Sequence, residues 1–131
     1  MVDRDEAQGL FDKRVQAWLS EDLDTYMDMF AEDLLMQTPM GEPLQGRAAY
    51  GELVRRSLQH VRPVGFEVHE IAVDGSKVLA EWTQTHEVRA DGRRLRYRGM
   101  SICEIRDGLI HAWREYYDPA DLQPDMNLQA S

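Results

Sequence analysis

The sequence predicts an α+β fold in which helices cover one face of a strongly curved antiparallel sheet, so that the sheet forms a cone. Two observations lead to this prediction. Apolar residues recur at helical spacing in the first part of the chain, and the dipeptide Asp-Gly then occurs three times between runs rich in β-branched and aromatic residues. With 131 residues, 43% of them hydrophobic, the chain is long enough for one globular domain with a sizeable core.

The helices are expected before the first of these turns. Over residues 4–19, Phe11, Val15 and Trp18 share one side, which predicts an amphipathic helix. A second, short helix is expected after Asp22, whose side chain suits an N-cap. The apolar stripe of this second helix consists of Leu23, Tyr26, Met27 and Phe30. An extended segment over 34–38 and a loop broken by proline and glycine then lead to a third helix, from Gly46-Arg47 to about His60.

The remainder predicts a four-stranded antiparallel meander. Its turns lie at Asp74-Gly75, Asp91-Gly92 and Asp107-Gly108, where a type I′ turn needs positive φ at both central positions. The strands are expected at about residues 64–73, 77–89, 93–106 and 109–117. The predicted domain therefore spans residues 1–118, and residues 119–131 form a polar C-terminal tail.

Strand alternation predicts which side chains line the cone. They are Trp82, Gln84 and His86 on the second strand, Tyr97, Gly99 and Ser101 on the third, and Trp113, Glu115 and Tyr117 on the last. Together with Met36 and Met40, the aromatic members predict a deep apolar cavity for a flat polycyclic or terpenoid ligand. The alternative is that the same aromatic side chains fill the core and leave no room for a ligand.

Net charge and composition exclude several classes of function. The formal net charge of −9 opposes binding to nucleic acid, and no stretch reaches the roughly 20 apolar residues of a membrane span. A single cysteine, Cys103, excludes a disulfide framework and is expected to be a small buried residue. The histidines lie on separate elements and no glycine-rich phosphate loop occurs, so neither a metal site nor a cofactor is expected. These features favour a cytoplasmic protein.

Several segments resemble one known family. They are Asp22-Leu23-Asp24, Phe30-Ala31-Glu32-Asp33, the run from Pro39 to Arg47, Trp82-Thr83-Gln84-Thr85-His86, and Arg106 to Ile110 leading to Trp113 to Asp118. The chain resembles the SnoaL-like and ketosteroid-isomerase-like branch of the nuclear-transport-factor-2-like superfamily. The resemblance implies a cystatin-like α+β barrel and a homodimer formed through the outer sheet face. It does not fix the reaction, because this fold hosts isomerases, dehydratases, polyketide cyclases, epoxide hydrolases and binding modules.

Two mechanisms of this family fit the sequence incompletely. In ketosteroid isomerase the base, the tyrosine and the acid match Thr38, Arg14 and Ser101 here, so that mechanism is rejected. Limonene epoxide hydrolase uses an Asp-Arg-Asp set to activate water and two further residues to hold that water. The positions that match the Asp-Arg-Asp set here are Trp82, Gln84 and Glu115. The positions that match the two residues holding the water are Met36 and Thr38. Only Glu115 preserves a carboxylate, and a lone glutamate can still act as a base.

A third mechanism gives the leading hypothesis. In SnoaL-like polyketide cyclases an inward histidine and an aspartate act on the substrate, and His86 lies in the matching segment. The next strand carries no aspartate, so Glu115 becomes the candidate partner of His86 for proton transfer near neutral pH. The alternative is that His86 lies half exposed at a hairpin end while Glu115 pairs with an arginine or a tyrosine hydroxyl.

The sequence thus favours a cofactor-free isomerase, lyase or cyclase that transfers a proton on a small apolar cyclic ligand. The alternatives are an epoxide hydrolase centred on Glu115 and a non-catalytic binding module. The predicted substrate-binding residues are Trp82, Gln84, Tyr97, Ser101, Trp113, Tyr117, Met36, Thr38 and Tyr26. On the opposite face, a band of arginines including Arg94 is expected to pair across strands with glutamates such as Glu87, in a solvated or dimer-contact ladder.

Overall fold

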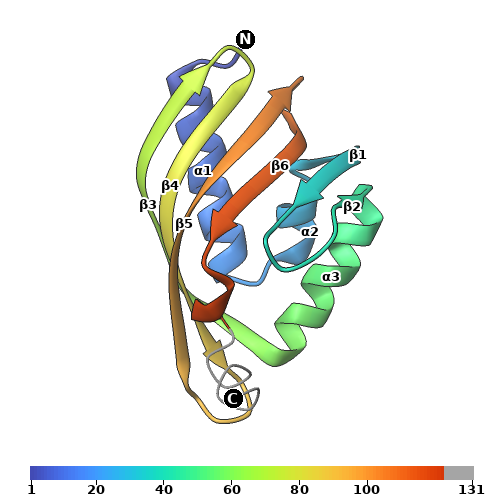
Figure 1. Ribbon diagram of the computed structural model, residues 1–131. Helices are drawn as coiled ribbons and strands as arrows, with labels where there is room; N and C mark the ends of the chain where they lie inside the picture. Colours follow the sequence, from blue (N-terminus) through green and yellow to red (C-terminus); the bar gives the residue numbers. More distant parts are fainter. Residues whose placement is uncertain (123–131) are drawn as a thin grey trace.

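The computed structural model describes residues 1–122, and they form helices packed on one face of a curved six-stranded sheet (Figure 1). The helices are α1 (Arg4–Leu19), α2 (Leu23–Met27) and α3 (Arg47–His60). The strands are β1 (Phe30–Gln37), β2 (Leu44–Gln45), β3 (Val61–Asp74), β4 (Lys77–Val88), β5 (Arg94–Arg106) and β6 (Leu109–Tyr117). A 3₁₀ helix, η1 (Pro119–Asp121), begins the predicted tail, whose residues 123–131 lie outside the described residues.

The helices agree with the sequence prediction except at the end of α2. The Asp22 carboxylate accepts a hydrogen bond from the Thr25 backbone N–H at 3.3 Å, which confirms the predicted N-cap. Phe30 was expected to continue the α2 stripe and instead begins β1. The cause is pairing with β6, because Phe30 is opposite Ile110 and the Ile110 N–H donates to the Met29 carbonyl at 2.9 Å.

The predicted meander is confirmed, and two further strands extend it. The sheet order is β2-β1-β6-β5-β4-β3, with β1 parallel to β6 and all other pairs antiparallel. The sheet is therefore mixed rather than wholly antiparallel, and it stays open because β2 and β3 do not pair. Strand β3 also begins earlier than expected and includes Pro63, which an edge strand tolerates because one side of its backbone is unpaired.

The three Asp-Gly turns differ in backbone conformation. Both Asp107 (φ 53°) and Gly108 (φ 75°) have positive φ, as a type I′ turn requires. At the other two sites only the glycine, Gly75 or Gly92, has positive φ. The Asp-Gly signal thus located all three hairpins, while the predicted backbone conformation is correct only at the last.

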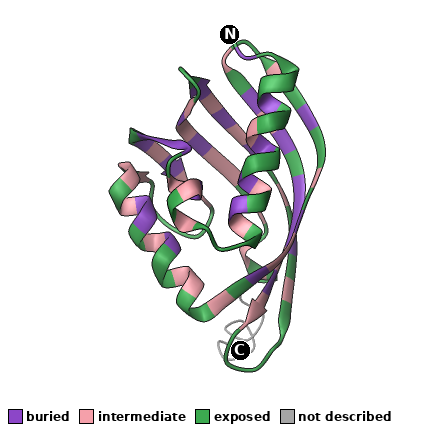
Figure 2. Ribbon diagram, turned by 180° about the vertical axis from the view of Figure 1, so that it is seen from behind, coloured by how far each residue is buried: buried purple, intermediate pink, exposed green. Residues whose placement is uncertain are grey.

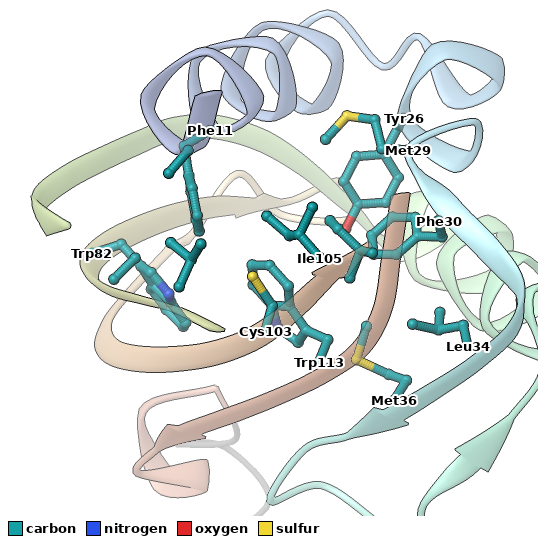
Figure 3. Packing of buried hydrophobic residues seen from close by; sticks show 14 of the residues in the cluster. Phe11, Tyr26, Met29, Phe30, Leu34, Met36, Trp82, Cys103, Ile105 and Trp113 are labelled. Atoms are coloured by element: carbon teal, nitrogen blue, oxygen red, sulfur yellow. The ribbon is translucent and has the colours of Figure 1, made fainter. Parts of the chain in front are cut away.

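The core lies between the sheet and the helices, and α1, α2 and α3 all contribute buried residues to it (Figures 2 and 3). Phe11 contacts Trp113 with ring centroids 5.8 Å apart, and Cys103 is buried as expected. Trp82 lies across β5 at Gly99, where an added Cβ would come within 2.7 Å of the indole. This glycine therefore leaves the space that the tryptophan ring fills.

Candidate active site

A cavity of about 260 Å³ opens between the concave face of the sheet and the helices. Side chains from α1, α2 and α3 form one wall, and side chains from β4, β5 and β6 form the other. The lining residues are Arg14, Trp18, Tyr26, Thr38, Met40, Tyr50, Leu53, Val54, Ser57, Gln84, Tyr97, Glu115, Tyr117 and Leu122. The wall is thus mostly aromatic and aliphatic with a few polar groups, as in sites for small organic molecules.

Glu115 is the carboxylate of this cavity. It lies on β6, two residues after Trp113, and Trp113 Nε1 donates a hydrogen bond to Glu115 Oε1 at 2.8 Å. Burial raises the pKa of the Glu115 carboxyl, while the nearby Arg14 charge and the hydrogen bond from Trp113 oppose that rise. A carboxyl with a raised pKa in an apolar cavity is suited to exchanging protons with a ligand.

Arg14 faces the same cavity from α1 and is only 3% exposed. The centre of its guanidinium lies 4.0 Å from the Trp113 ring centroid and 5.4 Å from those of Tyr26 and Phe66. Burial disfavours its charge, but the oxygens of Tyr26 and Tyr50 and the Glu115 carboxyl outweigh that effect, so the pKa of Arg14 lies above its ordinary value. The guanidinium therefore remains charged.

A chain of hydrogen bonds runs from Arg14 to Tyr50. Arg14 Nη2 donates to the Tyr26 hydroxyl at 3.0 Å, and the Tyr26 and Tyr50 hydroxyls are 2.6 Å apart. Burial raises the pKa of Tyr50 well above its ordinary value, so its hydroxyl stays protonated. When Tyr26 donates its proton to Tyr50, the Tyr50 proton is available to a ligand in the cavity.

The remaining polar lining comes mainly from the strands and the loop after β1. Burial raises the pKa values of Tyr97 and Tyr117, so both hydroxyls are neutral. Tyr97 and Tyr117 contact each other with ring centroids 5.0 Å apart, and Gln84 is opposite Tyr97 in the β4–β5 register. Thr38 hydrogen-bonds with Tyr117 at the loop side of the cavity.

His86 lies beyond the cavity wall. Its ring is 5.3 Å from that of Tyr97 and 6.1 Å from that of Trp18, centroid to centroid, and it does not itself line the cavity. Burial lowers the pKa of His86 to about 4, and its Nε2 atom is buried without a hydrogen-bond partner among the described residues. Across residues 1–122, no hydrogen bond or ion pair joins His86 to Glu115.

The other predicted site residues divide into two groups. Tyr26, Thr38, Gln84, Tyr97 and Tyr117 line the cavity together with Glu115. The second group belongs to the core beside it and consists of Trp82, Ser101, Trp113 and Met36, each at most 2% exposed. Within this group, Trp82 Nε1 donates to the Ser101 hydroxyl at 3.1 Å. Trp113 donates a hydrogen bond to Glu115, and its ring face contacts the Arg14 guanidinium.

Of the side chains that the helices contribute to the site, the sequence predicted only Tyr26. Arg14, Trp18, Tyr50 and Ser57 are the polar or aromatic lining residues that it did not assign to a ligand. One signal was present for Arg14, which shares a helix face with Phe11 and Trp18 at spacings of three and four residues. A charged residue in the middle of an apolar stripe indicates either a snorkelling side chain or a functional group in the core.

No cluster of histidine, cysteine and acidic side chains within the described part of the chain is arranged to hold a metal ion. Over the same residues, no helix combines the length and the apolar character needed to cross a membrane.

Comparison with known proteins identifies the family of this chain. Residues 11–113 match the SnoaL-like domain. The chain belongs to the SnoaL-like family. Epoxide hydrolase EphG of Mycobacterium tuberculosis H37Rv is 31% identical over 110 residues, which cover 82% of this SnoaL-like chain and 70% of the relative. The resemblance that the sequence motifs suggested is thereby confirmed.

Solved structures agree with this SnoaL-like fold. An LEH-like epoxide hydrolase of Mycobacterium tuberculosis is 28% identical with a TM-score of 0.77, over 88% of this chain and 81% of that one. A candidate isomerase of Bacillus subtilis has a TM-score of 0.85 at 19% identity, over 97% and 96% of the two chains. A candidate polyketide cyclase of Xanthomonas campestris has a TM-score of 0.78 at 24% identity, over 91% and 95%. The last two comparisons establish the fold alone.

Proposed function

We propose that this SnoaL-like protein is a cofactor-free enzyme that transfers a proton on a small apolar cyclic ligand of polyketide, steroid or terpenoid type. Its reaction is an isomerisation, an elimination or a cyclisation, and Glu115 is the acid and base. The observation that carries the proposal is the Glu115 carboxyl, whose pKa burial raises, inside an aromatic cavity that also holds hydrogen-bond donors.

In the proposed step, Glu115 removes a proton from a carbon next to a carbonyl group of the ligand. The electron pair of that C–H bond then forms a C=C bond, and the carbonyl π electrons move to oxygen and form an enolate. The Tyr50 hydroxyl donates to this oxygen, and Arg14 strengthens the donor through Tyr26. In a ligand with a C=C bond next to that carbon, the enolate is a dienolate. Return of the proton to its γ-carbon moves the C=C bond into conjugation with the re-formed carbonyl group, which completes an isomerisation and restores the Glu115 carboxylate.

His86 takes an indirect part in this proposal. The sequence hypothesis pairs it with Glu115, but His86 contacts the back of Tyr97 and lies outside the cavity. We therefore assign the proton transfer to Glu115 and give His86 the role of positioning Tyr97, whose ring forms part of the cavity wall.

Epoxide hydrolysis is the second candidate, and the similarity to EphG favours it. Glu115 would then remove a proton from water, the resulting hydroxide would open the epoxide at carbon, and a tyrosine such as Tyr50 would protonate the oxygen that leaves. A non-catalytic binding module of the same fold is the third candidate.

Two isotope experiments distinguish these functions. Incubation with the cyclic ketone 2-tetralone in D₂O, followed by proton NMR, is expected to give loss of the α-proton signals faster than in buffer alone. Incubation with indene oxide in oxygen-18 water, followed by mass spectrometry, is expected to give no labelled diol above the buffer rate. Labelled diol without ketone exchange would support the hydrolase instead, and binding without either reaction would support the binding module.

We also propose that the protein is a homodimer through the outer face of the sheet. A broad groove of about 700 Å³ lies there, and its lining includes Met100, 47% exposed, and Tyr116, 62% exposed. Beside it the predicted charge ladder is present in part, since Arg94 lies 3.7 Å from Glu87. Light scattering is expected to give twice the mass of one chain, and Met100→Asp is expected to give one chain mass. A wild-type monomer would contradict the proposal.

A further inference from the structure

The Arg14 guanidinium has hydrogen-bonding capacity that the protein does not use. Its Nη2 atom bonds to Tyr26, while its Nε and Nη1 atoms are buried and have no partner among the described residues. A buried donor without a partner costs free energy, and the cost is larger for a charged group. The contact with the Trp113 ring face compensates part of the charge, but it supplies no acceptor for these N–H groups.

A second unused donor lies one helical turn further along α1. Trp18 Nε1 is buried without a partner among residues 1–122, and Trp18 lines the same cavity as Arg14. Residues four positions apart lie on one helix face, so Arg14 and Trp18 line the cavity from the same side. Two neighbouring donor groups without protein acceptors indicate that a ligand supplies the acceptor atoms.

The charge balance of the cavity indicates which acceptor it is. Arg14 stays cationic, and none of the ion pairs formed within residues 1–122 includes it. The Glu115 carboxyl accepts a hydrogen bond from Trp113, and no hydrogen bond or ion pair within residues 1–122 joins it to Arg14, so it does not occupy the unused guanidinium N–H groups. A carboxylate on a ligand offers two acceptor oxygens in one plane, which matches the guanidinium geometry.

We propose that the cavity binds a small cyclic organic acid, whose carboxylate is held by Arg14 and Trp18 and whose ring lies against the aromatic wall. This inference rests on the cavity of the proposed function and narrows its substrate class from apolar rings to ring systems that carry an acid group. The ring is placed against the wall that Tyr97 and Tyr117 form together, and a ligand carbonyl group remains free to reach Tyr50.

The test compares acids with their neutral amides. Benzoate and 2-naphthoate are titrated into the protein against benzamide and 2-naphthamide, with chloride added to equal ionic strength. Calorimetry is expected to give at least one acid that binds about tenfold or more tightly than its amide. The Arg14 Nε–H signal in nitrogen-15 NMR is expected to shift saturably with that acid, and loss of the signal in Arg14→Lys assigns it. Equal affinity of acid and amide, or no saturable shift with either acid, would overturn the proposal.

Variants separate this proposal from the assignment of Glu115 as the base. Arg14→Gln is expected to lose the preference for the acid, and Trp18→Phe, which keeps an aromatic ring, is expected to weaken acid binding about threefold. Glu115→Gln is expected to bind the acid at least as tightly as the wild type, because it removes a competing carboxyl, although it stops proton transfer. Near-UV circular dichroism checks that each variant is folded. The comparison on the wild-type protein stands even where a variant unfolds.

Discussion

Replacing Glu115 with glutamine is expected to slow the catalysed exchange of ligand α-protons by about 10²–10⁴-fold. The amide of glutamine occupies nearly the same volume and can still accept the hydrogen bond from Trp113, so the cavity keeps its shape. Glutamine cannot take up a proton at neutral pH, which removes the base while leaving the aromatic walls and the donors in place.

The pH dependence provides a second readout for the same variant. Because Glu115 acts as a base in its deprotonated form, exchange by the wild type is expected to fall as the pH is lowered through the raised pKa of this carboxyl. This acid limb is expected to be absent in Glu115→Gln. The matched control is Glu67→Gln, since Glu67 is an exposed carboxylate on β3, away from the cavity. A rate for Glu115→Gln that equals the control rate would exclude Glu115 as the base.

The folded protein is expected to lose stability in mild acid through His86. Its ordinary pKa is 6.5, and burial lowers this to about 4 in the folded chain. Between these values the unfolded chain binds a proton that the folded chain does not, so the free energy of unfolding falls as the pH falls from about 6.5 to about 4. The full loss in the free energy of unfolding caused by His86 is about 3 kcal/mol. This loss is absent above pH 6.5 and complete below pH 4.

Urea unfolding at pH 7 and pH 4.5 measures this effect. Other titratable groups also change protonation in this range, so the informative quantity is the difference between the wild type and His86→Gln. The variant is expected to lose less stability on acidification, whereas His60→Gln, at an exposed helix end, is expected to behave like the wild type. Equal losses in the wild type and in His86→Gln would contradict a buried neutral His86.

Local patterns predicted the elements of this fold well, because helix periodicity, N-caps and Asp-Gly turns are short-range features. The end of α2 and the strand β1 were predicted less well. Phe30 has the right spacing for the α2 stripe, and only its pairing with Ile110, eighty residues away, makes it part of a strand. Such parallel pairing depends on a contact between distant segments, which periodicity does not reveal.

The candidate site was predicted in part for a similar reason. Alternation along the strands gives the face on which Gln84, Glu115 and Tyr117 lie, but it does not give the depth of each side chain in the cone. Trp82 shares that face and packs into the core across Gly99. Arg14 was known from the sequence only as a position where the tyrosine of ketosteroid isomerase is missing, and its role depends on where α1 crosses the sheet.

The two outermost strands of the sheet also affect how the protein behaves at high concentration. Strand β2 has only two residues, and β3 carries Pro63 and two irregularities of register along its length. Short edges, prolines and bulges are poor templates for adding a strand from another molecule. Copies of this chain are therefore expected to have little tendency to join edge to edge into fibrils.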